Sequence, residues 1–279
     1  MIIRIFKNRR ARRVAALPVL LLWGFLMFRW YEHRCVFQPS SEMAVEAGAL
    51  GRAAEDVFIP VDKGGKIEAW YFPANAETGP ASRRVILVCH GNAGNISHRL
   101  ELCQLLLETG ASVMVFDYRG YGRSPGWPNE ENTCRDAQAA CQWLRQKGFA
   151  ATNIVGYGES LGGGVAAELA LREPLGGVIL QSTFTSVPDL GAQMFPWLPV
   201  RLLGAIKYDT VHKLPRLIMP VLILHSREDT LIPFAHAERN FAAAREPKTF
   251  REMRGDHNDA ILTGREEILT AVNEFLGAL

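Results

Sequence analysis

The sequence lacks the signatures of metal, nucleotide and nucleic-acid binding. Its five cysteines include no CxxC pair, and no cysteine or histidine spacing matches a metal site, so we expect no metal. The Gly-Lys-Ser/Thr of a phosphate-binding P-loop is missing, and the chain needs no cofactor for the chemistry inferred below. A formal net charge of only +2 does not indicate a nucleic-acid-binding protein.

The chain also has no internal repeat and no low-complexity segment. Hydrophobic residues make up 48% and charged residues 22% of its 279 positions, which is ordinary for a folded globular protein. This composition excludes a disordered tail protein, a collagen-like fibre and a polytopic membrane protein. The length allows one large or two small domains.

The near-neutral charge hides an uneven distribution. Residues 1–13 form a basic flank that contains no acidic residue but six basic ones, namely Arg4, Lys7, Arg9, Arg10, Arg12 and Arg13. An uncharged apolar run, Val14–Phe28, follows, and with the next three residues it predicts a membrane anchor over residues 14–31. The run is shorter than the ~20 residues of a typical spanning helix, so a cleaved signal and a buried or interfacial helix stay as alternatives.

The charges on either side of this run predict an orientation. Six positive charges precede it and only Arg29 and Arg34 follow closely. The positive-inside rule then keeps the N-terminus cytoplasmic and places the body on the exported side, which is the periplasm in a bacterium. We therefore expect a single-pass membrane protein whose partners are the membrane, through its N-terminal helix, and a small-molecule or lipid-linked acyl substrate.

From about residue 55 the chain alternates between predicted strands and helices. Several strands, such as Val85–Cys89, are continuous apolar runs, as expected for strands covered on both faces. The alternation predicts an α/β fold with a mostly parallel, doubly wound sheet. One stretch of about residues 187–220 breaks the pattern and predicts a small helical cap inserted into a single domain that spans residues 35–279.

The pentapeptide Gly158–Gly162 is the strongest chemical signal. It matches G-x-S-x-G, follows a predicted strand and opens a predicted helix, which is the context that a nucleophilic serine elbow requires. The turn at Ser160 is so sharp that side chains two residues away would collide, and glycine removes them. A dinucleotide fingerprint would need glycine where Leu161 stands. Ser160 is therefore the predicted nucleophile.

Chain order selects the base and the acid that this serine needs. His257 lies between the last predicted strand and the last helix, and Asp229 follows the predicted strand 221–225. The order Ser160, Asp229, His257 is that of a hydrolase triad on an α/β sheet. Glu228 and Asp256 are competitors for the acid, but Asp256 adjoins the histidine in sequence, and adjacent side chains rarely face each other.

A tetrahedral intermediate needs two donors to its oxyanion. We predict that the Leu161 N–H is one and the Asn92 N–H the other, with Ala93 as the alternative to Asn92. His90 is expected to brace the same loop by hydrogen bonds. Arg119, on a neighbouring loop, either pairs with a carboxylate or meets substrate.

Several ordered motifs together resemble a known superfamily. They are HGNAGN (residues 90–95), DYRGYGRS (117–124), GESLGG (158–163), Asp-x-x-Ile-Pro (229–233) and Gly-Asp-His-Asn (255–258). The chain from about residue 35 resembles the α/β-hydrolase superfamily, and within it the membrane-anchored group that includes Bem46-like proteins and protein depalmitoylases. Ser226 departs from the glycine usual at that position, in a turn outside the triad.

The resemblance implies an ester or thioester hydrolase and does not choose the substrate. Together with the triad, it predicts a membrane-anchored serine hydrolase that works through an acyl-enzyme. A serine peptidase on the same fold and a non-catalytic, membrane-anchored scaffold are the alternatives. Residues 194–200 of the cap line an acyl pocket, touch lipid or serve as ordinary packing.

Overall fold

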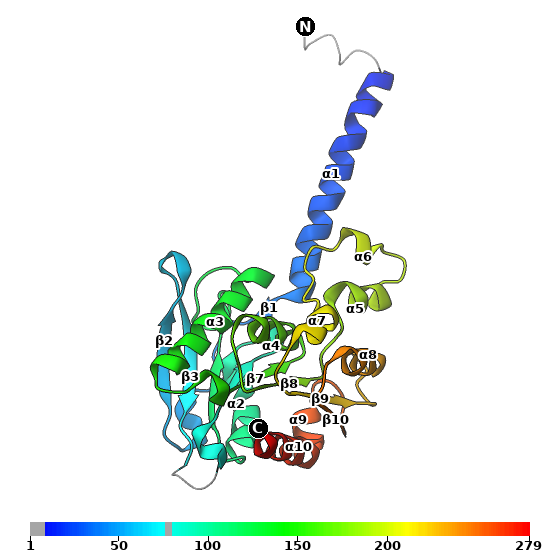
Figure 1. Ribbon diagram of the computed structural model, residues 1–279. Coiled ribbons are helices and arrows are strands. Elements are labelled where there is room, and N and C mark those ends of the chain that lie inside the picture. The colour runs from blue at the N-terminus through cyan, green and yellow to red at the C-terminus, as the bar shows by residue number, and fades with distance from the viewer. Residues whose placement is uncertain (1–8, 76–79) are drawn as a thin grey trace.

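Eight strands form a mostly parallel sheet at the centre of the molecule. The computed structural model describes residues 9–75 and 80–279 (Figure 1). The strand order is β10-β9-β8-β7-β4-β6-β3-β2; the β2–β3 and β3–β6 pairs are antiparallel and the other five are parallel. The strands are β2 (Glu55–Pro60), β3 (Lys66–Phe72), β4 (Val85–Cys89), β6 (Ser112–Phe116), β7 (Ile154–Glu159), β8 (Gly177–Gln181), β9 (Val221–Ser226) and β10 (Lys248–Met253).

Helices cover both faces of the sheet and create two hydrophobic cores. One core packs α3, α4 and α8 against the sheet, and the other packs α2 and α10 against the opposite face. The helices are α2 (Leu100–Leu107), α3 (Glu130–Gln146), α4 (Leu161–Arg172), α8 (Ala235–Ala243), α9 (Ala260–Thr263) and α10 (Arg265–Ala278). The predicted α/β fold with a mostly parallel, doubly wound sheet is therefore confirmed.

The apolar runs of the central strands explain this architecture. Every residue of β4, β6 and β8 is buried, because helices cover both of their faces. The helix that the leucines of residues 97–108 indicate in the sequence does not begin as a regular α-helix. It begins as a 3₁₀ turn at Ile96–Arg99, where the Asn95 side chain caps the Ser97 N–H, and only then continues as α2.

The stretch 187–220 holds three short helices rather than a layer of the sheet. They are α5 (Val187–Met194), α6 (Val200–Leu203) and α7 (Thr210–Lys213). We call residues 187–220 the cap. Pro196, Pro199 and Gly204 interrupt it, so none of these helices is long. The cap follows β8 directly and lies beside the lower end of the N-terminal helix (Figure 1).

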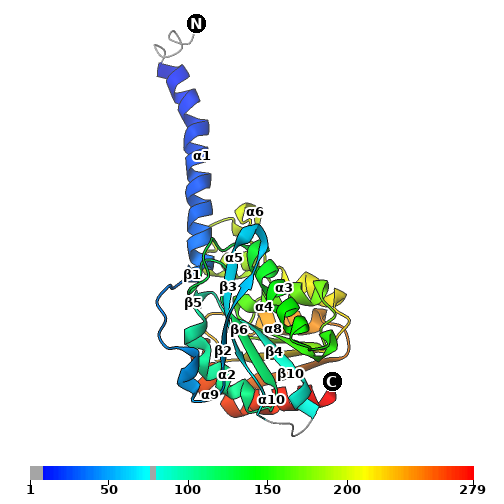
Figure 2. The same ribbon diagram turned by 90° about the vertical axis from the view of Figure 1, so that its left-hand side faces the viewer.

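The N-terminal helix α1 (Arg9–Val36) is longer than the anchor predicted over residues 14–31 and projects away from the body (Figures 1 and 2). Residues 1–8 of the predicted basic flank lie outside the described residues. By length and hydropathy, no membrane-spanning helix is found among residues 9–75 and 80–279. The chain leaves α1 as β1 (Gln38–Pro39), which pairs in parallel with β5 (Ala93–Gly94) at the foot of the helix (Figure 2).

Candidate active site

Ser160 stands on a strained turn between β7 and α4. Its φ of 52° and ψ of −115° lie in a region that residues with a side chain rarely adopt. A Cβ at Gly158 would lie 2.5 Å from the Gly162 carbonyl oxygen, and one at Gly162 would overlap the Cys89 carbonyl. The two glycines of the pentapeptide are therefore required by close backbone approach, as the sequence predicted.

Two hydrogen bonds, one from the end of β8 and one from the loop after it, hold this turn in place. The Ser160 N–H donates to the Gln181 carbonyl at 2.9 Å, and the Thr183 hydroxyl donates to the Ser160 carbonyl at 2.6 Å. These two bonds fix the serine from both sides of its Cα. These contacts stabilise the strained backbone conformation of Ser160 in the folded state.

The structure brings together the three residues predicted as a triad. His257 Nε2 lies 3.1 Å from Ser160 Oγ, and His257 Nδ1 lies 2.8 Å from Asp229 Oδ2. All three side chains are nearly buried. The other Asp229 oxygen accepts the backbone N–H groups of Leu231 and Ile232 at 3.0 and 2.7 Å, which fixes the carboxylate. This hydrogen-bond chain has the geometry of a nucleophile, a base and an orienting acid.

The competing acids have other partners. Asp256 Oδ1 accepts the N–H and hydroxyl of Thr230 and the N–H of His257, each at 2.8 Å, so it joins the two loops that carry the triad. Hydrogen bonds from the Thr230 and His257 N–H groups lower the pKa of Asp256. Glu228 accepts the Gly255 N–H at 3.0 Å. Neither carboxylate is hydrogen-bonded to the imidazole, so Asp229 is the one of the three acids that contacts the His257 ring.

His225, at the end of β9, supports the acid from behind. Its Nε2 lies 2.8 Å from the Ile232 carbonyl and 3.7 Å from Asp229 Oδ2. Burial lowers the pKa of His225, which favours a neutral ring beside the triad. His225 lies at the end of the predicted strand 221–225, and no role was predicted for it. Its position four residues before Asp229 was the available signal.

The predicted oxyanion donors line the same cavity as the nucleophile. Leu161 is the first residue of α4, so its N–H has no acceptor inside the helix and belongs to the positive end of the helix dipole. Asn92, Ala93, Ser160 and Leu161 all line one cavity. The Asn92 carbonyl accepts the Gln38 N–H at 3.0 Å and the Tyr121 hydroxyl at 2.8 Å, which anchors this part of the loop.

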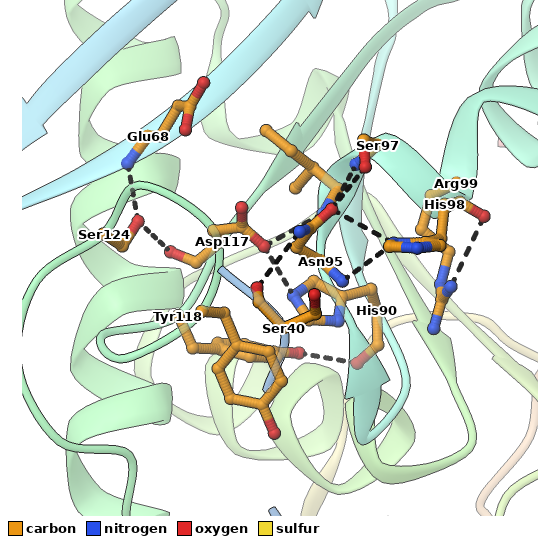
Figure 3. Close-up of polar contacts among 12 residues, drawn as sticks. Ser40, Glu68, His90, Asn95, Ser97, His98, Arg99, Asp117, Tyr118 and Ser124 are labelled. Atoms are coloured by element: carbon orange, nitrogen blue, oxygen red, sulfur yellow. Dashed lines mark hydrogen bonds and ion pairs between the residues drawn. The ribbon is translucent and has the colours of Figure 1, made fainter. Parts of the chain in front are cut away.

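A buried polar network holds the rest of the loop 90–97 (Figure 3). His90 Nε2 lies 3.4 Å from Asp117 Oδ1, and the same oxygen accepts the Ile96 N–H at 3.0 Å. The Asn95 amide donates to the Ser40 carbonyl at 3.1 Å. His90 thus contacts its loop and Asp117 as a brace would, whereas the contributions of Asn95, Asp117 and the N-terminal segment were not predicted.

Arg119 pairs with carboxylates, which is the first of the two roles considered for it. Its Nε donates to Asp136 Oδ1 at 2.7 Å, and its guanidinium also pairs with Asp62. Burial raises the pKa of Asp136 to about 6, although Arg119 opposes this rise. Arg119 does not line the cavity at Ser160, so nothing in its surroundings connects it to substrate.

An apolar cavity of about 410 Å³ opens at Ser160. Its walls come from α1, from the loops that carry Asn92 and Ile232, and from α5 and the segment that follows it. Cap residues Met194, Phe195, Leu198 and Val200 all line it, so this part of the cap faces the space next to the nucleophile. Its volume falls within the ~300–1,000 Å³ of small-molecule sites.

Comparisons with known proteins identify the family and the fold. The family described as "Serine aminopeptidase, S33" matches residues 80–210. Protein Rv2307c of Mycobacterium tuberculosis is 38% identical over 274 residues, covering 97% of this chain and 96% of its own. Protein bem46 of Schizosaccharomyces pombe is 35% identical over 163 residues, 55% of this chain and 54% of its own. The Pyrococcus furiosus esterase Pf2001 superimposes with a TM-score of 0.69 at 20% identity, covering 87% of this chain and 97% of its own.

The chain belongs to the α/β-hydrolase superfamily, as its motifs indicated. The family assignment supports a hydrolase. The roles of the individual site residues follow from the geometry and are argued next.

Proposed function

We propose that this protein is a membrane-associated serine hydrolase that cleaves carboxylic esters or thioesters through an acyl-enzyme. The observation that carries the proposal is the continuous hydrogen-bond chain from Asp229 through His257 to Ser160, at 2.8 and 3.1 Å. A serine at its ordinary pKa is a weak nucleophile, and this chain supplies the base that activates it.

In the acylation step, His257 Nε2 takes the proton of Ser160 as Oγ bonds to the substrate carbonyl carbon. The carbonyl π electrons move to oxygen, and the N–H groups of Leu161 and Asn92 hold the resulting oxyanion. Asp229 keeps the imidazole in the tautomer that presents Nε2 and stabilises its positive charge. The bond to the leaving oxygen or sulfur then breaks, and the leaving group takes the proton from His257.

In the deacylation step, water replaces the leaving group. His257 takes one water proton while the water oxygen bonds to the acyl carbon. The second tetrahedral intermediate collapses with cleavage of the bond to Ser160 Oγ, which recovers its proton from His257. The products are a carboxylic acid and the regenerated enzyme, without any redox step or cofactor.

Labelling with a fluorophosphonate probe tests the nucleophile. We expect the wild-type chain and Ser41→Ala, a change at an exposed loop serine, to label, and Ser160→Ala to remain unlabelled. All three proteins should also give the same circular dichroism spectrum. Labelling that persists in Ser160→Ala refutes the nucleophile, and a folded wild-type chain that does not label favours the scaffold alternative.

The name of the matching family raises the peptidase alternative, and the cavity argues against it. An aminopeptidase must hold the free ammonium of its substrate, which calls for an available carboxylate. Among the described residues that line the cavity, the one carboxylate is Glu32, and it already accepts two backbone N–H groups and pairs with Arg29. Faster cleavage of aminoacyl amides than of matched esters would reverse this preference.

We also propose that the N-terminus is cytoplasmic and that the body lies at the membrane surface on the exported side. The support is the charge asymmetry of the sequence and the apolar side chains of α1, since every side chain from Pro18 to Met27 is exposed. Protease treatment of intact and permeabilised cells tests the orientation. In a cell without a wall, digestion of the body only after permeabilisation would overturn this orientation. In a bacterium the outer membrane is opened before the first protease treatment, and digestion only after the inner membrane is also permeabilised would overturn it.

A further inference from the structure

One face of α1 forms a wall of the cavity at Ser160. Phe28, Tyr31, Glu32 and Cys35 all line it, and their spacing of three, four and seven residues places them on the same side of a helix. The cap forms the opposite wall through residues such as Leu190 and Met194. The N-terminal helix is thus part of the pocket as well as a stalk.

Glu32 attaches the cap to this wall. Its side chain is almost fully buried, and Oε1 accepts the N–H groups of Ala205 and Ile206 at 2.8 and 3.1 Å. Oε2 pairs with Arg29 at 2.5 Å. Losing these bonds would leave two backbone donors unpaired, so the clamp holds the cap against α1 and keeps the pocket closed on that side.

The residues that directly follow α1 are hydrogen-bonded to the loop 90–97, which carries the predicted oxyanion donor Asn92. Directly after α1, the Gln38 N–H donates to the Asn92 carbonyl and the Ser40 N–H to the Gly94 carbonyl, each at 3.0 Å. One continuous stretch of chain therefore shapes the far wall of the pocket and fixes a loop at its catalytic end.

Exposed apolar side chains surround the place where α1 meets the cap. Met194 is 51%, Trp197 77% and Leu202 82% exposed. Met194 ends α5, Leu202 lies in α6 and Trp197 lies between these helices, and Figure 1 shows α5 and α6 at the lower end of α1. On the other side, Trp127 stacks on His33 of α1 and is 63% exposed. Clustered apolar exposure of this kind marks a surface that meets lipid or another apolar partner.

We propose that α1 is the specificity-determining wall of an acyl pocket and that the substrate carries a long unbranched acyl chain. The chain lies between α1 and the cap, with its carbonyl carbon at Ser160 and its tail directed toward the lipid-facing end of the pocket. This proposal rests on the proposed hydrolase function. It commits to an acyl chain because the cavity is apolar, continuous with the nucleophile and bounded by a helix that exposes an uncharged apolar stretch from Pro18 to Met27.

Chain length is the first measurement, made on the full-length chain in detergent micelles. With acetyl, butyryl, hexanoyl and octanoyl nitrophenyl esters, kcat/KM should rise by about fourfold per methylene, which corresponds to about 0.8 kcal/mol. A preference for acetyl over octanoyl esters overturns the long-chain pocket. Absence of hydrolysis and of probe labelling instead refutes the proposed function.

A matched pair of variants tests the role of α1. Cys35→Trp fills the pocket from the helix, whereas Arg34→Trp places the same side chain on an exposed neighbouring position that does not line it. We expect Cys35→Trp to lower the ratio of octanoyl to acetyl kcat/KM at least about tenfold relative to Arg34→Trp. Equal ratios in the two variants would show that α1 is not a specificity wall.

A third measurement needs no turnover. Of the five cysteines, Cys35 is partly exposed and the other four are buried, so a maleimide should alkylate Cys35 first. In Ser160→Ala protein, a hexadecanoyl ester should slow this alkylation several-fold, while an acetyl ester should leave it unchanged; Cys35→Ser identifies the labelled site. Equal rates with both esters contradict the pocket even if the triad is correct.

Discussion

Adding one methyl group at Gly122 should displace the loop 90–97, which carries the predicted oxyanion donor Asn92, although Gly122 belongs to a different loop. Gly122 has a φ of 50°, and a Cβ there would lie closer than 3.0 Å to Asp117 Oδ2, which cannot move freely because Asp117 is fully buried. The other oxygen of this carboxylate accepts the Ile96 N–H and lies 3.4 Å from His90. Gly122→Ala must therefore displace the residue that organises the loop.

The magnitude follows from two separable terms. A side chain at positive φ costs about 1–3 kcal/mol, and each buried polar group that loses its partner costs about 1–3 kcal/mol more. With the Ile96 N–H and His90 both affected, the second term is about 2–6 kcal/mol. Gly51→Ala isolates the first term, because Gly51 has a φ of 65° and nothing within 4 Å of its added Cβ.

Urea unfolding and ester hydrolysis measure the two consequences. Gly122→Ala should lose at least about 2 kcal/mol more unfolding free energy than Gly51→Ala, and its kcat on acetyl esters should fall while that of Gly51→Ala is retained. The Asp117→Ser background removes the colliding carboxylate. There Gly122→Ala should cost no more than the strain alone, even if the single variant is too unstable to purify. Equal losses at Gly122 and Gly51 in the wild-type background would refute the reasoning.

Three further predictions address the triad, the turn and a buried carboxyl. Asp229→Asn should lower kcat by about 10⁴-fold and Asp256→Asn far less, measured with one short ester; similar losses would mean that the acid is misassigned. Gly163→Ala should lower the unfolding free energy, since its Cβ would overlap the Thr183 side chain that holds the nucleophile turn; an unchanged urea midpoint would contradict this. Burial raises the pKa of Glu68 from 4.5 to about 7, so the folded state binds its proton more tightly and loses stability as pH rises between these values. Glu68→Gln should flatten that loss, by roughly 3 kcal/mol at most, and an unaltered pH profile of unfolding would disprove the assignment.

The features that could be predicted from the sequence are those with local causes. The strand Val85–Cys89 is recognisable because both of its faces are apolar, and the nucleophile turn because Gly158 and Gly162 must approach backbone atoms. His257 and Asp229 required one more step, the order of the loops at the carboxyl edge of the sheet. Chain order sufficed because parallel strands all present their following loops at that edge.

The features that were missed depend on contacts between distant segments. Asn95 looks like a loop residue in HGNAGN, yet its amide bonds the carbonyl of Ser40, 55 positions away. Asp117 begins another loop and accepts a hydrogen bond from the Ile96 N–H, 21 positions earlier in the chain. Hydrophobic periodicity carries no information on such pairings, because each polar group finds its partner only after the sheet has formed.

Glu32 shows why the role of the N-terminal helix could not be predicted from the sequence. The anchor over residues 14–31 was delimited by the apolar run and the three residues after it, and Glu32 had no role in that prediction. In the structure the helix continues to Val36, and Glu32 is buried against the cap through Ala205 and Ile206. A buried carboxylate requires partners, and those partners are available only if the cap closes on α1. Glu32 therefore connects the N-terminal helix to the cap, and this connection makes the helix a wall of the pocket at Ser160.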